Sequence, residues 1–172
     1  MPLPTIATPT YELELPSTGK KIKYRPFLVK EEKLLVLALE TEDTKQISTA
    51  IKTVLKNCIQ SRGVKVENLP TFDIEYLFLN IRGKSVGEEI EVNLIAPDDE
   101  ETSVPVTINI DDIKISKKKD HTNKIKLDKT LMMEMKYPSL DEFVKNNFDF
   151  DGEVDMDQSF DLIASCIDKI YN

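Results

Sequence analysis

The sequence has few of the residues from which most enzyme active sites are built. It holds one histidine, two cysteines and five glycines among 172 residues. So few glycines cannot form the glycine-rich loops that bind dinucleotides or nucleoside triphosphates, and no cysteine and histidine cluster has zinc-ligand spacing. The single histidine, His121, lies in a lysine-rich stretch without a residue placed to orient it as a general base. We therefore expect a protein that is not an enzyme and that uses no cofactor.

Long hydrophobic runs are also missing. No window approaches the ~18 uninterrupted apolar residues of a membrane span, and the first residues lack the basic stretch and apolar run of a secretory signal. Cys58 and Cys166 each fall within an apolar helical pattern, so we interpret both as buried, reduced thiols. A disulfide between them would require the two helices to pack together. The sequence favours a soluble protein in a reducing, cytoplasmic setting, without a membrane partner.

Charge of one sign dominates, and it is unevenly distributed. The net charge is −8. Residues 137–172 hold nine acidic residues against two lysines, whereas residues 114–129 hold seven lysines against two aspartates. The acidic balance argues against nucleic acid as a partner. The lysine run at 117–119 has the chemistry to touch phosphate, but we interpret it as the solvated tip of a hairpin.

The N-terminal part of the chain changes from strand to helix periodicity. Apolar residues alternate on both sides of the turn residues 16–19, which predicts a β-hairpin with one buried face. Helical spacing then predicts a short helix over 31–39 and an amphipathic helix that Asp43 caps and that stops near Gly63. A third helix, over about 70–82, is apolar around nearly its whole circumference, which places it in the core or at an interface. Its candidate protein-binding residues are Phe72, Tyr76 and Leu79.

The middle of the chain has the alternation of antiparallel strands. A second hairpin is predicted over 90–110, where alternating apolar residues flank an acidic turn at 97–101. Shorter strands are expected around the lysine-rich stretch, at 113–115, 125–127 and 131–136. The order of strands and helices is typical of an α+β fold.

The acidic C-terminal part is predicted to be helical. Ser139 can cap a short helix over 140–146, and a final helix is expected over 157–171 because its apolar residues have helical spacing. Candidate protein-binding residues on this stripe are Phe160, Ile163, Ile167 and Ile170. We expect one α+β domain over residues 1–172, with a hairpin and helical part (9–87), a mainly β part (88–136) and an acidic helical tail (137–172).

One acidic segment has the spacing of a calcium-binding loop. Counted from Asn147, oxygen side chains fall at loop positions 1, 3, 5, 9 and 12, and Gly152 falls at position 6, which is the EF-hand register. Position 1 is asparagine, and position 12 is a glutamine that cannot supply the usual bidentate carboxylate. A flexible acidic linker and a weak cation site therefore both stay open. The candidate ligands are Asn147, Asp149, Asp151, Asp155 and Gln158.

Several segments are similar to a known family. The sequence Tyr24-Arg25-Pro26-Phe27 opens the first of them, and their full ranges are 24–33, 72–79, 81–87 and 163–171. They resemble the T4-type bacteriophage baseplate hub (central spike complex) protein family, over about residues 9–171. The resemblance implies no catalytic residues. It implies a protein of contractile-tail baseplate assembly, in the host cytoplasm during assembly or in the tail baseplate of the virion.

Two functional hypotheses from different classes follow. The first is a baseplate hub component or tail-assembly chaperone that contacts other phage tail or hub proteins, in homo- or hetero-oligomers. An apolar third helix and an amphipathic tail helix suit such contacts. The second is a calcium-responsive binding module that uses residues 147–158.

Overall fold

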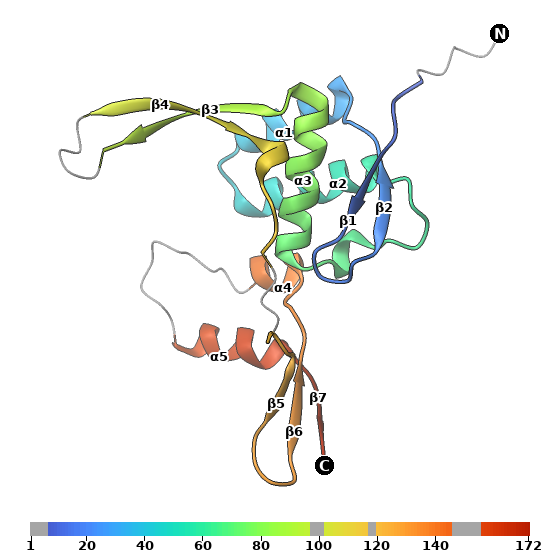
Figure 1. Ribbon diagram of the computed structural model, residues 1–172, viewed down its shortest axis with the longest axis vertical. Coiled ribbons are helices and arrows are strands. Elements are labelled where there is room, and N and C mark those ends of the chain that lie inside the picture. The colour runs from blue at the N-terminus through green and yellow to red at the C-terminus, as the bar shows by residue number, and fades with distance from the viewer. Residues whose placement is uncertain (1–6, 97–101, 117–119, 146–155) are drawn as a thin grey trace.

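The computed structural model describes residues 7–96, 102–116, 120–145 and 156–172. Over these ranges the chain forms the mixed α+β architecture that the sequence predicts, with an N-terminal hairpin, then helices, then small antiparallel sheets (Figure 1). Within the same ranges, no helix is long and apolar enough to cross a bilayer.

The N-terminal body consists of the first hairpin and three helices. Its strands pair in antiparallel register, with Leu13 opposite Ile22, and both side chains point into the core. The hairpin prediction is therefore confirmed. The elements of the body are β1 (Tyr11–Glu14), β2 (Lys21–Tyr24), α1 (Val29–Leu39), α2 (Thr44–Cys58), the short 3₁₀ helix η1 (Val66–Asn68) and α3 (Thr71–Val86).

Helix α2 begins where the sequence predicts and ends earlier. The Asp43 side chain accepts a hydrogen bond from the backbone N–H of Lys45 at 2.9 Å, which caps the helix. The helix ends at Cys58, before the stop predicted at Gly63. The reason is tertiary: the Cys58 carbonyl accepts from the backbone N–H of Arg25 at 3.0 Å, so the chain leaves the helix to pair with the end of β2.

Helix α3 continues one turn beyond the predicted end at residue 82. Gly83 lies inside the helix, where a Cβ atom would stand 3.3 Å from the Cδ1 atom of Ile110. The missing side chain therefore allows Ile110, which is buried, to pack directly on the helix. The helix ends at Gly87, whose φ of +115° is a conformation that other residues avoid.

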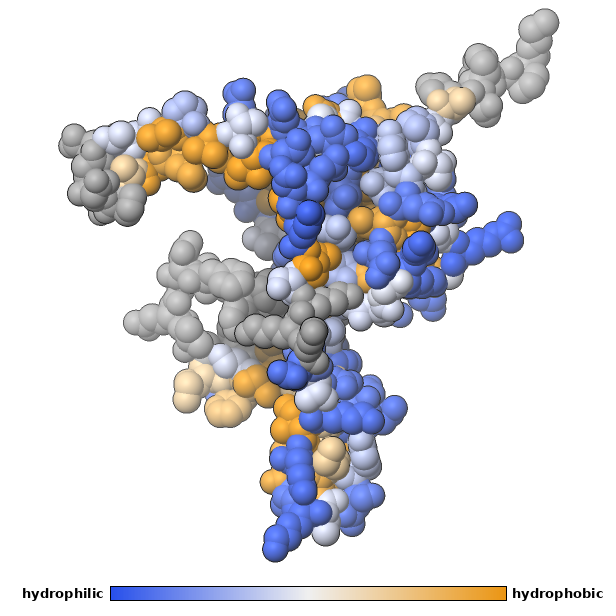
Figure 2. Space-filling view, viewed as in Figure 1, coloured by the Kyte–Doolittle hydropathy of each residue, from blue (hydrophilic) through white to orange (hydrophobic). Residues whose placement is uncertain are grey.

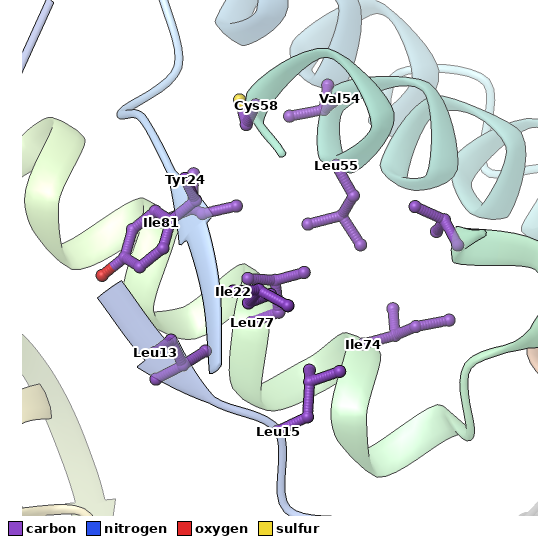
Figure 3. Packing of buried hydrophobic residues seen from close by; sticks show 11 residues of the cluster. Leu13, Leu15, Ile22, Tyr24, Val54, Leu55, Cys58, Ile74, Leu77 and Ile81 are labelled. Atoms are coloured by element: carbon purple, nitrogen blue, oxygen red, sulfur yellow. The ribbon is translucent and has the colours of Figure 1, made fainter. Parts of the chain in front are cut away.

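The hydrophobic core lies between the first hairpin, α2 and α3 (Figure 3). Burying one aliphatic side chain of this kind stabilises a fold by about 1.5–3 kcal/mol. The faces of α2 and of the first hairpin that point into this core are the apolar faces that the sequence predicts from helical spacing and alternation. The cluster of buried residues is Leu13, Leu15, Ile22, Tyr24, Val54, Leu55, Cys58, Val66, Ile74, Leu77 and Ile81.

Two buried carboxylates fasten the body together. Asp73, in the first turn of α3, accepts hydrogen bonds from the backbone N–H and the hydroxyl of Ser17, which ties the hairpin turn to the helix. Glu31 accepts from the backbone N–H of Leu28 at 2.8 Å and from the Arg25 guanidinium at 3.2 Å. Burial alone would raise the pKa of Glu31, but these two partners lower it below its ordinary value.

The second hairpin forms as predicted and projects from the body as an arm (Figure 1). We use "the arm" for β3 (Glu89–Ile95) and β4 (Ser103–Asn109). At its base, Lys84 donates to Glu88 at 2.6 Å and to Asp111 at 3.3 Å, and the hydrogen bond to Glu88 raises the pKa of Lys84. These contacts join the arm to the end of α3.

The strand predicted over 113–115 does not form. A single 3₁₀ turn, η2 (Ile110–Asp112), ends the arm, and the chain continues without regular structure to residue 116. Ile113 and Ile115 are 40% and 42% exposed, and no strand in the described part of the chain lies beside them to complete a ladder. Alternation over three residues is too short to form a strand without such a partner.

The C-terminal part contains a three-stranded antiparallel sheet in the order β5-β6-β7. The short strands predicted at 125–127 and 131–136 are confirmed as β5 and β6, and the short helix at 140–146 is confirmed as α4. The Ser139 hydroxyl accepts the Glu142 backbone N–H and so caps α4, as the sequence predicts. The elements are β5 (Lys124–Lys126), β6 (Met132–Met135), α4 (Leu140–Lys145), α5 (Met156–Ser165) and β7 (Ile167–Tyr171).

The prediction of one final helix over 157–171 is wrong in its second half. Helix α5 ends at Ser165, and β7 pairs with the free edge of β6, with Ile170 opposite Met133. Ladder hydrogen bonds and the strand preference of isoleucine overcome the helical spacing there. The same change leaves Cys166 at a turn, where it is half-buried, whereas Cys58 is buried as predicted, and both are free thiols.

Candidate protein-contact surfaces

The predicted residues of the third helix line a groove. Phe72, Tyr76 and Leu79 are half-buried on α3 and form one wall of a groove of about 940 Å³. We call it the α3 groove. Its other wall comes from Ile115, Ser116 and His121 and from Tyr137, which follows β6. The structure therefore brings together the three candidates that the sequence placed on this helix.

Aromatic rings shape the end of the α3 groove. The Tyr137 ring meets Phe72 edge-on, with 4.8 Å between centroids, and stacks on His121 at 6.1 Å. The Nε2 atom of His121 lies 2.7 Å from the Tyr137 hydroxyl. The expectation that nothing orients His121 is therefore wrong, because its partner comes from sixteen residues further along the chain. Rings with one apolar and one polar end are common in protein interfaces.

The predicted tail stripe is split between two elements. Phe160 and Ile163 lie on α5 and are 63% and 55% exposed. Ile167 and Ile170 lie on β7, where Ile167 is half-buried opposite Met135 and Ile170 is 55% exposed. The four side chains therefore do not form one helical stripe, and only the α5 pair keeps the geometry that the sequence predicted.

The outer surface of α1 was not predicted as a contact surface. Glu31 is its one buried residue, and its apolar side chains face outward on several sides. The signal in the sequence is the run of apolar residues over 34–39, which is too long for one face of a helix. The exposed side chains are Val29, Leu34, Val36, Leu37 and Leu39, together with Val86 at the end of α3.

The arm also presents an apolar face. Cross-strand pairing places Ile90, Val92 and Leu94 opposite Ile108, Val106 and Val104, so all six lie on one face. None of them is buried, and Leu94 is 53% exposed. Figure 2 shows apolar side chains along the arm, on the face turned toward the viewer.

Comparison with protein families places the chain. Residues 8–172 match the family described as T4 bacteriophage base plate protein. The chain belongs to this family. Comparison with curated proteins and with solved structures gave no match. The membership confirms the family resemblance at the level of the base plate, and it implies a structural role with contacts to other phage tail proteins.

The calcium hypothesis for this base plate protein stays a prediction. Asn147, Asp149, Asp151 and Asp155 lie outside the described residues, and Gln158 lies in α5. Among the residues that the structure describes, no group of three histidine, cysteine, aspartate or glutamate side chains is close enough to hold a metal ion.

Proposed function

We propose that this base plate protein acts without catalysis, as a component of the baseplate hub (central spike complex) or as a factor in its assembly. It does so by contacts with other tail or hub proteins in the host cytoplasm during assembly and, if it is a permanent subunit, also in the virion baseplate. The observation that supports this most directly is the α3 groove, where Phe72, Tyr76 and Leu79 form an open wall of apolar side chains.

The physical argument rests on desolvation. Contact between water and the apolar side chains of a groove is unfavourable in free energy, and a partner surface that covers these side chains removes that contact. Interfaces concentrate their binding free energy in a few such residues, among which tyrosine is enriched. Tyr76 and Tyr137 face the α3 groove from two different segments, so a partner that fills the groove contacts both.

The test uses a variant in the groove that leaves the core alone. Leu79 is half-buried and lies outside the core cluster, so Leu79→Asp places a charge in the α3 groove without opening the core. We expect it to abolish co-purification with the other baseplate hub proteins when they are co-expressed. The matched control is Glu75→Ala, which changes an exposed residue of the same groove and keeps partner capture.

Circular dichroism of both variants separates loss of binding from loss of folding. If Leu79→Asp remains folded and still captures every partner, the α3 groove is not the contact surface. Mass spectrometry of purified virions then distinguishes the two roles, because a permanent hub subunit stays in the particle and a transient assembly factor does not.

A further inference from the structure

A second groove lies behind α1, between that helix, α2 and α3. We call it the α1 groove. Its volume is about 460 Å³, and its lining is largely apolar. Leu39 and Val86, which border it, are 59% and 54% exposed, so the groove opens to the surface. Its apolar lining includes Phe27, Leu35, Ile47, Ile51 and Phe78.

An arginine without a full set of partners lines the same groove. The Nη1 atom of Arg82 is buried and has no hydrogen-bond partner among the described residues. A guanidinium N–H removed from water without an acceptor is unfavourable, and a carboxylate is the acceptor that fits its forked geometry. Glu32 also lines the groove, but its side chain is exposed, and no ion pair between described residues joins it to Arg82.

The chemistry of the occupant follows from these two features. It must offer apolar side chains to the lining and a carboxylate to Arg82. An occupant that offers only apolar groups would leave the buried guanidinium N–H unsatisfied. An amphipathic helix with an acidic border meets both requirements, because side chains three and four residues apart share one face.

Helix α5 of this chain has that chemistry. Met156, Phe160 and Ile163 recur at helical spacing and are 68%, 63% and 55% exposed. Asp161 follows Phe160 and is rotated from it by about 100° around the helix, so its exposed carboxylate borders the apolar stripe. In Figure 1, α5 lies beside β5–β7 and α4 separates it from the helices of the body, so α5 does not lie against α1 within one copy.

We propose that α5 of a second copy docks in the α1 groove, with Phe160 and Ile163 against the apolar lining and Asp161 paired with Arg82. Reciprocal docking closes a twofold dimer in which the same contact forms twice. The inference rests on the proposed function in treating this chain as a protein that acts by contacts, and it names a partner surface for the candidate contact residues Phe160 and Ile163. The α3 groove remains available to other tail proteins.

The experiment is a charge exchange, read by sedimentation equilibrium of the full chain over a range of concentrations. We expect a dimer, and we expect Arg82→Glu and Asp161→Arg each to raise its dissociation constant at least about tenfold. In the chain that carries both changes, the ion pair forms again with its charges exchanged, and we expect the dissociation constant of the dimer to return to within about threefold of the original value. The matched controls are Arg62→Glu and Asp168→Arg, which reverse exposed charges outside the groove and off α5 and leave the dimer unchanged.

A further variant tests whether the Arg82 guanidinium only stabilises the fold of its own copy. Arg82→Met keeps an unbranched side chain in the groove and removes the guanidinium with its unpaired Nη1 atom. We expect the urea midpoint of the monomer to stay the same or rise, while the dimer weakens. If Arg82→Met unfolds the chain, the guanidinium has an essential partner within its own copy and the proposal is wrong.

Two other outcomes of the sedimentation experiment would overturn the proposal. A chain that stays monomeric at submillimolar concentration overturns the proposal, because the groove is then filled by another tail protein or by the chain's own tail. A dimer that ignores both charge reversals, or that the exchanged pair does not restore, uses another surface and overturns it as well. Leu79→Asp, which tests the α3 groove, should leave the dimer intact, so failure of the proposed function and failure of this inference are separately visible.

Discussion

The two hairpins of this protein follow the same local rule and reach opposite environments. In β1–β2, alternating apolar residues turn inward, and Leu13 and Ile22 are 9% and 0% exposed. In the arm, the alternation is longer and equally regular, yet Leu94 and Val104 are 53% and 49% exposed. Alternation therefore specifies that a hairpin has an apolar face, but it does not specify that the same chain covers that face.

The difference has a physical origin in what surrounds each hairpin. The first is held against the helices along its length, by the core and by the hydrogen bonds from Ser17 to Asp73. The arm is held at its base, where Lys84 binds Glu88 and Asp111 and Ile110 packs on Gly83. A two-stranded hairpin alone is marginally stable in water. The body therefore supplies the stability, and the arm and α5 present apolar surface that suits contact with other proteins.

The largest expected effect comes from removing matched side chains from the two hairpins. Ile22→Ala should lower the free energy of unfolding by about 2–5 kcal/mol, because it leaves a cavity in the core. Leu94→Ala should change it by no more than about 0.5 kcal/mol, because that side chain is already exposed to water. Equilibrium unfolding in urea measures both. Equal losses would show that the arm folds as part of the core.

An intermediate effect is expected from the pH dependence of the body. Because the folded-state pKa of Glu31 lies below the ordinary 4.5, its stabilisation is complete well above pH 4.5 and is lost as the pH falls through the lowered value. The free-energy difference between the original chain and Glu31→Gln should therefore be largest near neutral pH and shrink below about pH 4.5. Urea unfolding at a series of pH values measures it.

The control for this pH experiment is Glu91→Gln, which removes one exposed carboxylate from the arm without touching the body. It corrects for the change in net charge that both substitutions share. A difference between the original chain and Glu31→Gln that stays constant from neutral to acidic pH would contradict the role of the Leu28 and Arg25 hydrogen bonds.

The smallest effect concerns the two thiols, of which one lies in the buried core of the body and the other in the more exposed C-terminal part. Cys58 is fully buried, and burial raises its pKa to about 11, so it should not react with a thiol reagent while the body is folded. Cys166 is half-buried at the end of α5 and should react in the folded protein. In a Cys166→Ser chain, absorbance assays should detect a reactive thiol only in denaturant. Rapid labelling of Cys58 without denaturant would show that the body opens locally.

Local sequence patterns predicted most of the helices and strands, but they did not predict which other segments lie beside each of them. The first hairpin, the arm, the Asp43 cap and the inward face of α2 follow from alternation, helical spacing and capping chemistry. Three of the predictions that failed are the stop at Gly63, the strand at 113–115 and a helix through Tyr171. Each depended on whether another segment offered a strand edge, as β2 does after α2 and β6 does for β7.

The candidate contact surfaces were likewise predictable from the sequence in one part and visible only in the structure in another. Phe72, Tyr76 and Leu79 could be chosen from the sequence because α3 has more apolar residues than one buried face requires. The unpaired Nη1 atom of Arg82 could not be chosen in this way. Each guanidinium N–H of an arginine in a helix usually reaches solvent or a partner, and only the tertiary structure shows that Nη1 reaches neither.

By itself, the sequence determined where strands and helices begin to form and that the protein has more apolar surface than one small core needs, because those depend on the spacing of neighbouring residues. It also determined the base plate family, through motifs along the chain. Only the tertiary structure decided which apolar faces are covered, which strand edge pairs with β7, and that the Nη1 atom of Arg82 is buried without a hydrogen-bond partner. Those outcomes depend on segments far apart in the sequence, and local spacing contains no information about their distance in space.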